Sequence, residues 1–142
     1  MKIAFYKGTL RGRAGWFSRL ARWADQGRYS HCEVVFSDGM CASASWYDGG
    51  VRFKKIAFNS LNWDIVELNF TPEAEAKVRA WFTRNEGRPY DLRGSLGVVF
   101  RPFGQGRRGW FCSEAVAASL GFAEPWRISP NQLAALLETV KW

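Results

Sequence analysis

The residue whose chemistry can be read most directly from the sequence is Cys112, in the segment Phe111-Cys112-Ser113-Glu114. An alanine-rich run follows it and ends at Gly121, a pattern typical of a short helix closed by a glycine. Cys112 is therefore expected in the first turn of a helix, where unpaired N–H groups and the positive dipole end stabilise a thiolate. Because most free cysteines are simply small buried apolar residues, the candidate nucleophile needs a base beside it.

The chain contains a single histidine, His31. It lies in the β-branched and aromatic run Tyr29–Phe36, which leads into Asp38-Gly39, a strong hairpin signal. The imidazole is thus predicted to lie on a strand. A cysteine at a helix start that faces a histidine on a sheet can pass its proton to the imidazole, which later protonates a leaving group. The residue types predict a Cys112–His31 pair.

The imidazole also needs an acceptor on its second nitrogen, which holds its tautomer and ring plane. The register of the hairpin decides which residue can supply one. If Asp38-Gly39 is a two-residue turn, His31 lies opposite Trp46, and Glu33 is the polar residue on the same face. Asp-Gly favours this turn, and a carboxylate stabilises imidazolium better than a hydroxyl does. Glu33 is therefore the preferred third member of the site.

A three-residue loop with Gly39 in the left-handed conformation would move the register by one residue. Ser45 would then lie opposite His31, and Ser43 would share its face of the sheet. These two hydroxyls remain the alternatives to Glu33 as the residue that orients the imidazole.

Four short motifs occur along the chain in this order: Tyr29-Ser30-His31, Arg88-Pro89-Tyr90-Asp91, Phe111-Cys112-Ser113-Glu114 and Ile128-Ser129-Pro130-Asn131-Gln132-Leu133. With them the chain resembles the circularly permuted NlpC-type papain-like cysteine hydrolases. This group includes the YiiX/YaeF-like proteins and is related to lecithin retinol acyltransferase. In the permuted group the histidine strand precedes the cysteine helix, as it does here. The resemblance spans roughly residues 28 to 133.

The resemblance implies an α+β papain-like fold in which an antiparallel sheet carries His31 and packs against the Cys112 helix. It also implies a thiol hydrolase or acyl transferase that acts on an amide or ester, in a cell-wall peptide or a lipid-derived acyl group. Tyr90, in the Tyr-Asp motif, would contact the substrate or donate to the oxyanion. No metal and no organic cofactor is implied.

Length and composition place further bounds on the protein. A chain of 142 residues that is 47% hydrophobic and 16% aromatic suits one compact domain over residues 1–142. Three cysteines leave at least one free thiol, and with one histidine their spacing does not suit a zinc site. The apolar run near Met1 is too short for a signal peptide, and no stretch approaches the roughly 18 residues of a membrane span. We therefore expect a cytoplasmic protein.

The net charge is +7 with a sequence pI near 9.7, and 14 of the 20 basic residues are arginine. Such charge favours anionic partners such as lipid headgroups, cell-wall polymers or nucleic acid. A basic amphipathic helix predicted over 13–26 and a basic loop over 101–108 would flank the cleft and favour an anionic membrane surface over nucleic acid. The rival hypothesis is a non-catalytic binding module for anionic lipid or nucleic acid on the same fold. The sequence leaves the oligomeric state open.

The other elements follow from turn and cap signals. Strands are predicted over 2–6, 51–56 and 63–68, the last two continuing the His31 hairpin as an antiparallel meander. Helices are predicted over 72–85 and 130–138, with a short helix or turn within 91–100.

Overall fold

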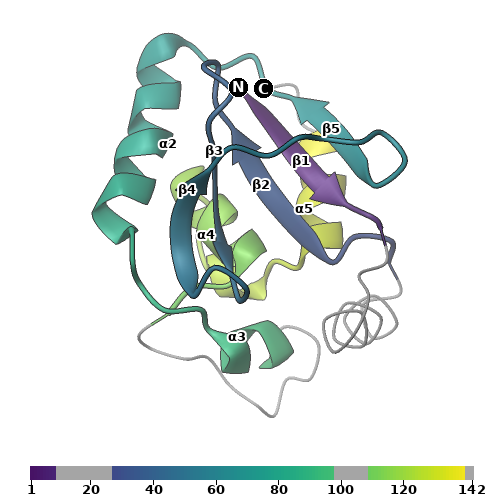
Figure 1. The fold of residues 1–142 in the computed structure, drawn as a ribbon, viewed down its shortest axis with the longest axis vertical. Coiled ribbons are helices and arrows are strands. Elements are labelled where there is room, and N and C mark those ends of the chain that lie inside the picture. The colour runs from purple at the N-terminus through teal and green to yellow at the C-terminus, as the bar shows by residue number, and fades with distance from the viewer. Residues whose placement is uncertain (9–26, 98–108, 140–142) are drawn as a thin grey trace.

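The fold is built on a five-stranded antiparallel sheet with the strand order β4-β3-β2-β1-β5 (Figure 1). The computed structural model describes residues 1–8, 27–97 and 109–139. Along the chain the strands are β1 (Lys2–Tyr6), β2 (His31–Val35), β3 (Cys41–Ser45), β4 (Gly50–Lys54) and β5 (Trp63–Glu67). The strand that carries His31 is therefore the central one.

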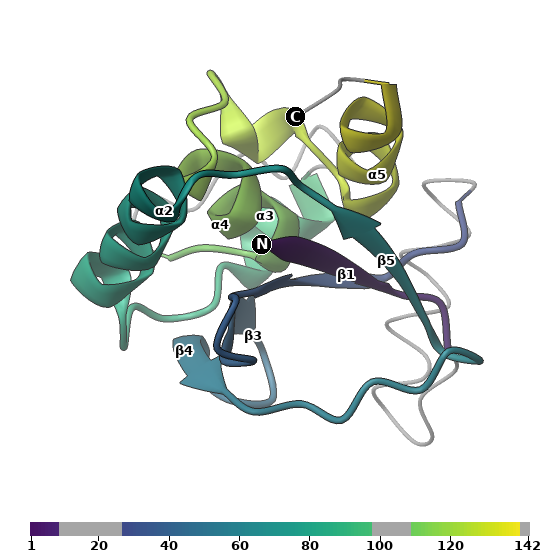
Figure 2. The same cartoon turned by 90° about the horizontal axis from the view of Figure 1, so that it is seen from above.

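The helices are α2 (Pro72–Asn85), α3 (Leu92–Gly97), α4 (Cys112–Ser119) and α5 (Pro130–Thr139), with a 3₁₀ turn η2 (Pro125–Arg127). Helices α2, α4 and α5 lie on one side of the sheet, whereas the link from β4 to β5 passes on the other side (Figure 2). The predicted α+β class is confirmed. None of the helices in the described ranges is long and apolar enough to span a bilayer.

The ends of α2 and α5 are set by side chains that satisfy the first free N–H groups of each helix. The Thr71 hydroxyl accepts a hydrogen bond from the Ala74 N–H at 3.2 Å. At α5 the Gln132 side chain accepts from the Ser129 N–H at 2.9 Å, and the Ser129 hydroxyl accepts from the Gln132 N–H at 3.2 Å. This reciprocal pair is a capping box.

Helix α4 is the element that carries Cys112 into the core. Cys112 is its first residue, and Gly121, just beyond its end, has φ of 85°. The sequence-based helix start and the closing glycine are both confirmed. Ala115, Val116 and Ala117 are fully buried, and the helix packs on β2 and β3. Small side chains allow this helix to lie close to the strand that bears His31.

The β2–β3 hairpin differs from the turn that the sequence favours. The Phe36 N–H donates to the Met40 carbonyl at 2.9 Å, so residues 37–39 form a three-residue loop. Gly39 has φ of 79°, and the Asp38 carboxylate accepts from the Met40 N–H at 3.0 Å, which stabilises this loop. The paired residues are Val34 with Ala42 and Val35 with Cys41. The two-residue turn, and the register derived from it, are therefore wrong.

The predicted meander is correct for β2, β3 and β4 and wrong for β5. Strand β5 lies at the opposite edge of the sheet, antiparallel to β1, with Lys2 opposite Glu67 and Tyr6 opposite Trp63. Residues 55–62 connect the two edges. Ile3 and Phe5 of β1 are fully buried, so a neighbour on each side of β1 satisfies backbone groups that water cannot reach. The basic helix predicted over 13–26 and the loop over 101–108 lie outside the described residues.

Candidate active site

The Cys112 thiol lies at the start of α4, against the inner face of β2. The residue is only 4% exposed. Its sulfur is within hydrogen-bond reach of two neighbouring residues of β2, His31 and Cys32. As the first residue of a helix, Cys112 also has a backbone N–H without an acceptor inside the helix. The thiol is thus surrounded by donors, which favours the thiolate form.

His31 begins β2, and its two ring nitrogens serve two different partners. Nε2 lies 2.7 Å from Oε1 of Glu33, two residues along the same strand. Nδ1 therefore remains for the hydrogen bond that His31 makes with Cys112. Burial by itself would lower the pKa of His31. The charge and hydrogen bond of the Cys112 thiolate outweigh that effect and, with Glu33, raise the pKa to about 10.

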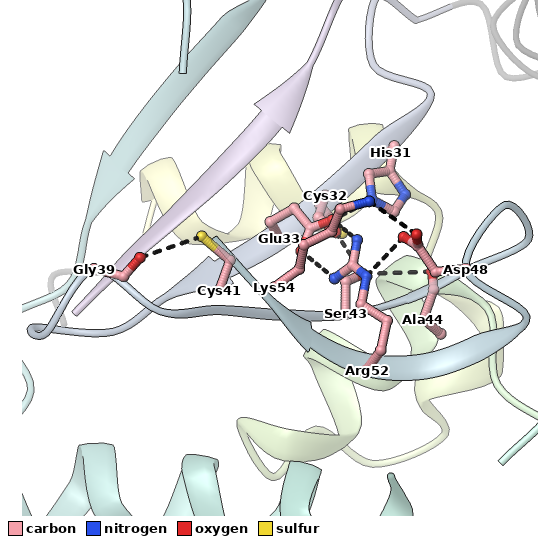
Figure 3. Close-up of polar contacts among 10 residues, drawn as sticks. All are labelled: His31, Cys32, Glu33, Gly39, Cys41, Ser43, Ala44, Asp48, Arg52 and Lys54. Carbon is pink, nitrogen blue, oxygen red and sulfur yellow. Dashed lines mark hydrogen bonds and ion pairs between the residues drawn. The ribbon is translucent and has the colours of Figure 1, made fainter. Parts of the chain in front are cut away.

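Glu33 is a carboxylate that is only 1% exposed, and Arg52 of β4 neutralises it (Figure 3). One guanidinium nitrogen donates to Oε2 at 2.7 Å, and the other donates to Oε1, the atom that also faces His31. Burial opposes ionisation, but the hydrogen bonds from Arg52 and His31 prevail and hold the pKa of Glu33 below its usual value. Glu33 is therefore an ionised acceptor for the imidazole.

The network continues outwards from Arg52 to the turn between β3 and β4 (Figure 3). Arg52 Nε donates to Asp48 at 2.8 Å, and Lys54 Nζ donates to the other oxygen of Asp48, also at 2.8 Å. Against the opposing effect of burial, these bonds lower the pKa of Asp48 to about 2. The guanidinium is thus held between two carboxylates, which fixes its plane and its reach.

The Cys112 thiol has a pKa well below its ordinary value. The largest cause is the hydrogen bond from Cys32, and the positive charge and hydrogen bond of His31 add to it, against the opposing effect of burial. The pKa of Cys32 itself is raised well above its usual value, by burial and then by the neighbouring Cys112, so Cys32 stays a thiol and can donate. The arrangement supports a Cys112 thiolate paired with a His31 imidazolium before any substrate binds.

Tyr90 lies close enough to the thiol for the charge of Cys112 to act on it. Its residue forms a parallel bridge with Trp110, two positions before Cys112, and its hydroxyl donates to Ser95 Oγ at 3.3 Å. Burial and the nearby Cys112 charge raise the pKa of Tyr90. Tyr90 therefore keeps its proton and remains a hydrogen-bond donor at the pH values where the thiolate exists.

A cavity of about 500 Å³ opens beside the imidazole, on the face of the sheet that the β4–β5 link covers. His31 and Tyr90 line it, whereas Cys112 does not. The exposed rings of Trp46 and Tyr47 stand at its wall together with Trp63 and with charged side chains that include Lys54 and Lys55. The cavity therefore offers apolar surface and charges of both signs, because Glu33 and Asp48 also line it, and it borders the Cys112–His31 pair on the histidine side.

The structure brings together all four of the residues that sequence reasoning selects: Cys112, His31, Glu33 and Tyr90. The two serines that were the alternatives to Glu33 are engaged elsewhere. The Ser43 hydroxyl donates to the Cys32 carbonyl at 2.7 Å, and the Ser45 hydroxyl bonds Asp48.

Two residues of the site were missed by sequence reasoning, Cys32 and Arg52. Cys32 directly follows His31, and alternation along a strand would place it on the other face, away from the histidine side chain. It contacts the thiol because α4 packs over that inner face. Arg52 carries no local signal, since its link to Glu33 depends on how β4 pairs across the sheet.

A scan against protein-family models finds no match to this chain, and a search of curated proteins finds no significantly similar sequence. Within the described ranges, no group of three or more His, Cys, Asp or Glu side chains is placed to hold a metal ion.

Proposed function

We propose that this protein is a cysteine hydrolase or acyl transferase with a circularly permuted, NlpC-type papain-like fold. The observation that carries the proposal is the contact of Cys112, at the start of α4, with a His31 ring whose other nitrogen lies 2.7 Å from Glu33. The chain order supports it too, because the histidine strand precedes the cysteine helix. The central antiparallel sheet packed on α4 fits the fold that the sequence resembles.

The proposed reaction starts from the thiolate–imidazolium pair. The Cys112 sulfur attacks the carbonyl carbon of an amide or ester, and the carbonyl electron pair moves onto oxygen. The backbone N–H of Cys112 donates to this oxyanion. The Tyr90 hydroxyl is the proposed second donor, and its single O–H turns from Ser95 Oγ to the oxyanion. When the tetrahedral intermediate collapses, the bond to the leaving amine or alcohol breaks, and the His31 imidazolium gives that group its proton. The product is an acyl group bound to Cys112 as a thioester.

The second half of the reaction regenerates the enzyme. Neutral His31 takes a proton from water, or from the hydroxyl or amine of an acceptor, which then attacks the thioester. The acyl group leaves as an acid or is transferred, and the thiolate–imidazolium pair is restored. Glu33 holds the imidazole in the same orientation in both halves. The cavity beside His31 is the proposed binding site for the substrate, a cell-wall peptide or a lipid-derived acyl group.

Acylation of the thiol by an activated ester tests this function without knowledge of the natural substrate. We expect the protein to release p-nitrophenolate from p-nitrophenyl acetate or octanoate in a burst stoichiometric with enzyme, and intact mass spectrometry to find one acyl group on Cys112. A Cys112→Ser variant should give neither signal, and Cys41→Ala, which removes a buried cysteine outside the site, should give both. If Cys112→Ser is acylated as fast as the native chain, the hydrolase proposal fails and the non-catalytic binding module becomes the better account.

A further inference from the structure

Arg52 is a charged residue of this site to which the proposed reaction gives no role. It lies on β4, and its guanidinium donates a hydrogen bond to each carboxylate oxygen of Glu33 (Figure 3). Its side chain is 14% exposed. Three of its five N–H groups are already used, two on Glu33 and one on Asp48. A guanidinium occupied in this way is poorly placed to bind an anionic substrate and well placed to act on Glu33.

The charge of Arg52 balances the charges of the buried groups around Cys112. The buried cluster consists of Glu33, Arg52, His31 and Cys112. With thiolate and imidazolium present it carries two negative and two positive charges, so its net charge is zero. If an uncharged residue replaced Arg52, ionised Glu33, Cys112 and His31 would leave one uncompensated negative charge in a site that is almost closed to water. The cluster would then take up a proton.

The proton taken up has two possible positions, and both damage the site. On Cys112 it converts the thiolate to a thiol, which is a poor nucleophile. On Glu33 it removes the carboxylate that accepts from Nε2 of His31, so the ring loses the partner that fixes its tautomer. In the part of the chain that the structure describes, Arg52 is the only arginine or lysine that forms an ion pair with Glu33.

We propose that Arg52 is a positioning residue of this site: its guanidinium keeps Glu33 ionised and balances the charge of the buried cluster, so that thiolate and imidazolium coexist. This inference rests on the proposed function, because it concerns the same nucleophile. It assigns Arg52 no contact with reacting atoms. The charged and titratable groups around the pair include Cys32, Glu33, Asp48, Arg52, Lys54 and Tyr90. Two further buried carboxyl groups lie nearby, Asp91 beside Tyr90 and Glu114 in the first turn of α4, and all the variants below leave both unchanged.

The test measures the pH profile of Cys112 alkylation by iodoacetamide, site by site, using peptide mass spectrometry. Arg52→Met should shift the profile upwards by at least about one pH unit, which at about pH 6 means a rate roughly tenfold lower. Arg52→Lys keeps the positive charge but loses the two parallel hydrogen bonds to the Glu33 carboxylate, so it should shift the pH profile less than Arg52→Met. Arg79→Met is the matched control, since Arg79 forms an ion pair with Asp38 at 2.8 Å on the surface and should leave the profile as it is.

The decisive variant removes both charges. In Glu33→Gln/Arg52→Met the glutamine amide oxygen can still accept from Nε2 of His31, and the thiolate and imidazolium alone make the cluster neutral. The low-pH alkylation lost in Arg52→Met should therefore return to within about threefold of the native rate. A purely structural role of Arg52 would give no such rescue. The double variant also preserves the test if Arg52→Met does not fold, because it leaves no unpaired buried charge.

An unshifted profile in Arg52→Met, or a double variant as slow as Arg52→Met, would overturn the inference. The proposed function fails separately. If Arg52→Met shifts the profile and the double variant restores it, yet no acyl group forms on Cys112 from p-nitrophenyl esters, the charge role of Arg52 stands and the hydrolase proposal is wrong. Ordinary, slow alkylation of native Cys112 would overturn both.

Discussion

Glu33 Oε1 lies 2.7 Å from His31 Nε2, and the two residues are separated by one position on the same strand. Alternate residues of a strand point to the same face, so this contact does not depend on how β2 pairs with β3. It commits Nε2 to the carboxylate and leaves Nδ1 for the Cys112 thiol. The proposed chemistry therefore depends on a short stretch of β2 and on the first turn of α4.

Cys32 is expected to contribute measurably to the reactivity of Cys112. Its thiol donates to the Cys112 sulfur, which is the largest cause of the low Cys112 pKa. Cys32→Ala should therefore raise that pKa and slow alkylation of Cys112 at about pH 6 by roughly three- to tenfold. Cys41→Ala is the matched control, because Cys41 is equally buried on β3 and its thiol contacts the Gly39 carbonyl instead. Equal rates in the two variants would show that Cys32 does not donate to the nucleophile.

The stability of the protein should depend on pH in a way that reports the ion pair. The pKa of His31 is raised from 6.5 to about 10 on folding, so its contribution is full below pH 6.5 and is lost as the pH rises to about 10. The pKa of Cys112 is lowered from 9.0, so its contribution is full above pH 9.0 and is lost as the pH falls through the lower, folded value. Between 6.5 and 9.0 the two slopes cancel.

Urea unfolding of the native chain and of Cys112→Ser tests this dependence. The unfolding free energy of the native chain minus that of Cys112→Ser should be constant between about pH 6.5 and 9. This difference should decrease below about pH 6.5 and above about pH 9, with a slope of at most about 1.4 kcal/mol per pH unit for one proton. The variant removes the thiolate from both the folded and the unfolded chain. The pH-dependent contributions of titratable groups elsewhere are the same in both proteins, so they cancel in the difference. A difference that stays constant from about pH 5 to 10 would contradict the ion pair.

Local signals were sufficient for the helices in the described ranges and for the choice of Cys112 and His31 as a pair. Thr71, Ser129 and Gly121 mark helix ends through hydrogen bonds and backbone conformations confined to a few residues. The position of Cys112 at a helix start needs no knowledge of the rest of the fold. Glu33 was chosen through a register that is wrong, and it still meets His31 because residues two apart on a strand share a face.

Features set by non-local pairing could not be predicted in the same way. Strand β5 pairs with β1 at the far edge of the sheet, although β4 precedes it in sequence. Asp38-Gly39 is compatible with two loop lengths, and the Asp38 side chain, which bonds the Met40 N–H, stabilises the longer one. The partnership of Arg52 with Glu33 depends on the pairing of β2 with β3 and of β3 with β4, so it becomes visible only once these three strands are aligned.

The central claim is that Cys112 is a thiolate held by His31, and its alkylation tests this most directly. In the native chain at about pH 6, iodoacetamide should modify Cys112 at least about tenfold faster than Cys32 or Cys41, whose pKa values are raised. His31→Ala should abolish most of this advantage while circular dichroism shows an unchanged fold. Slow and equal labelling of all three cysteines, or an unchanged Cys112 rate in His31→Ala, would contradict the account.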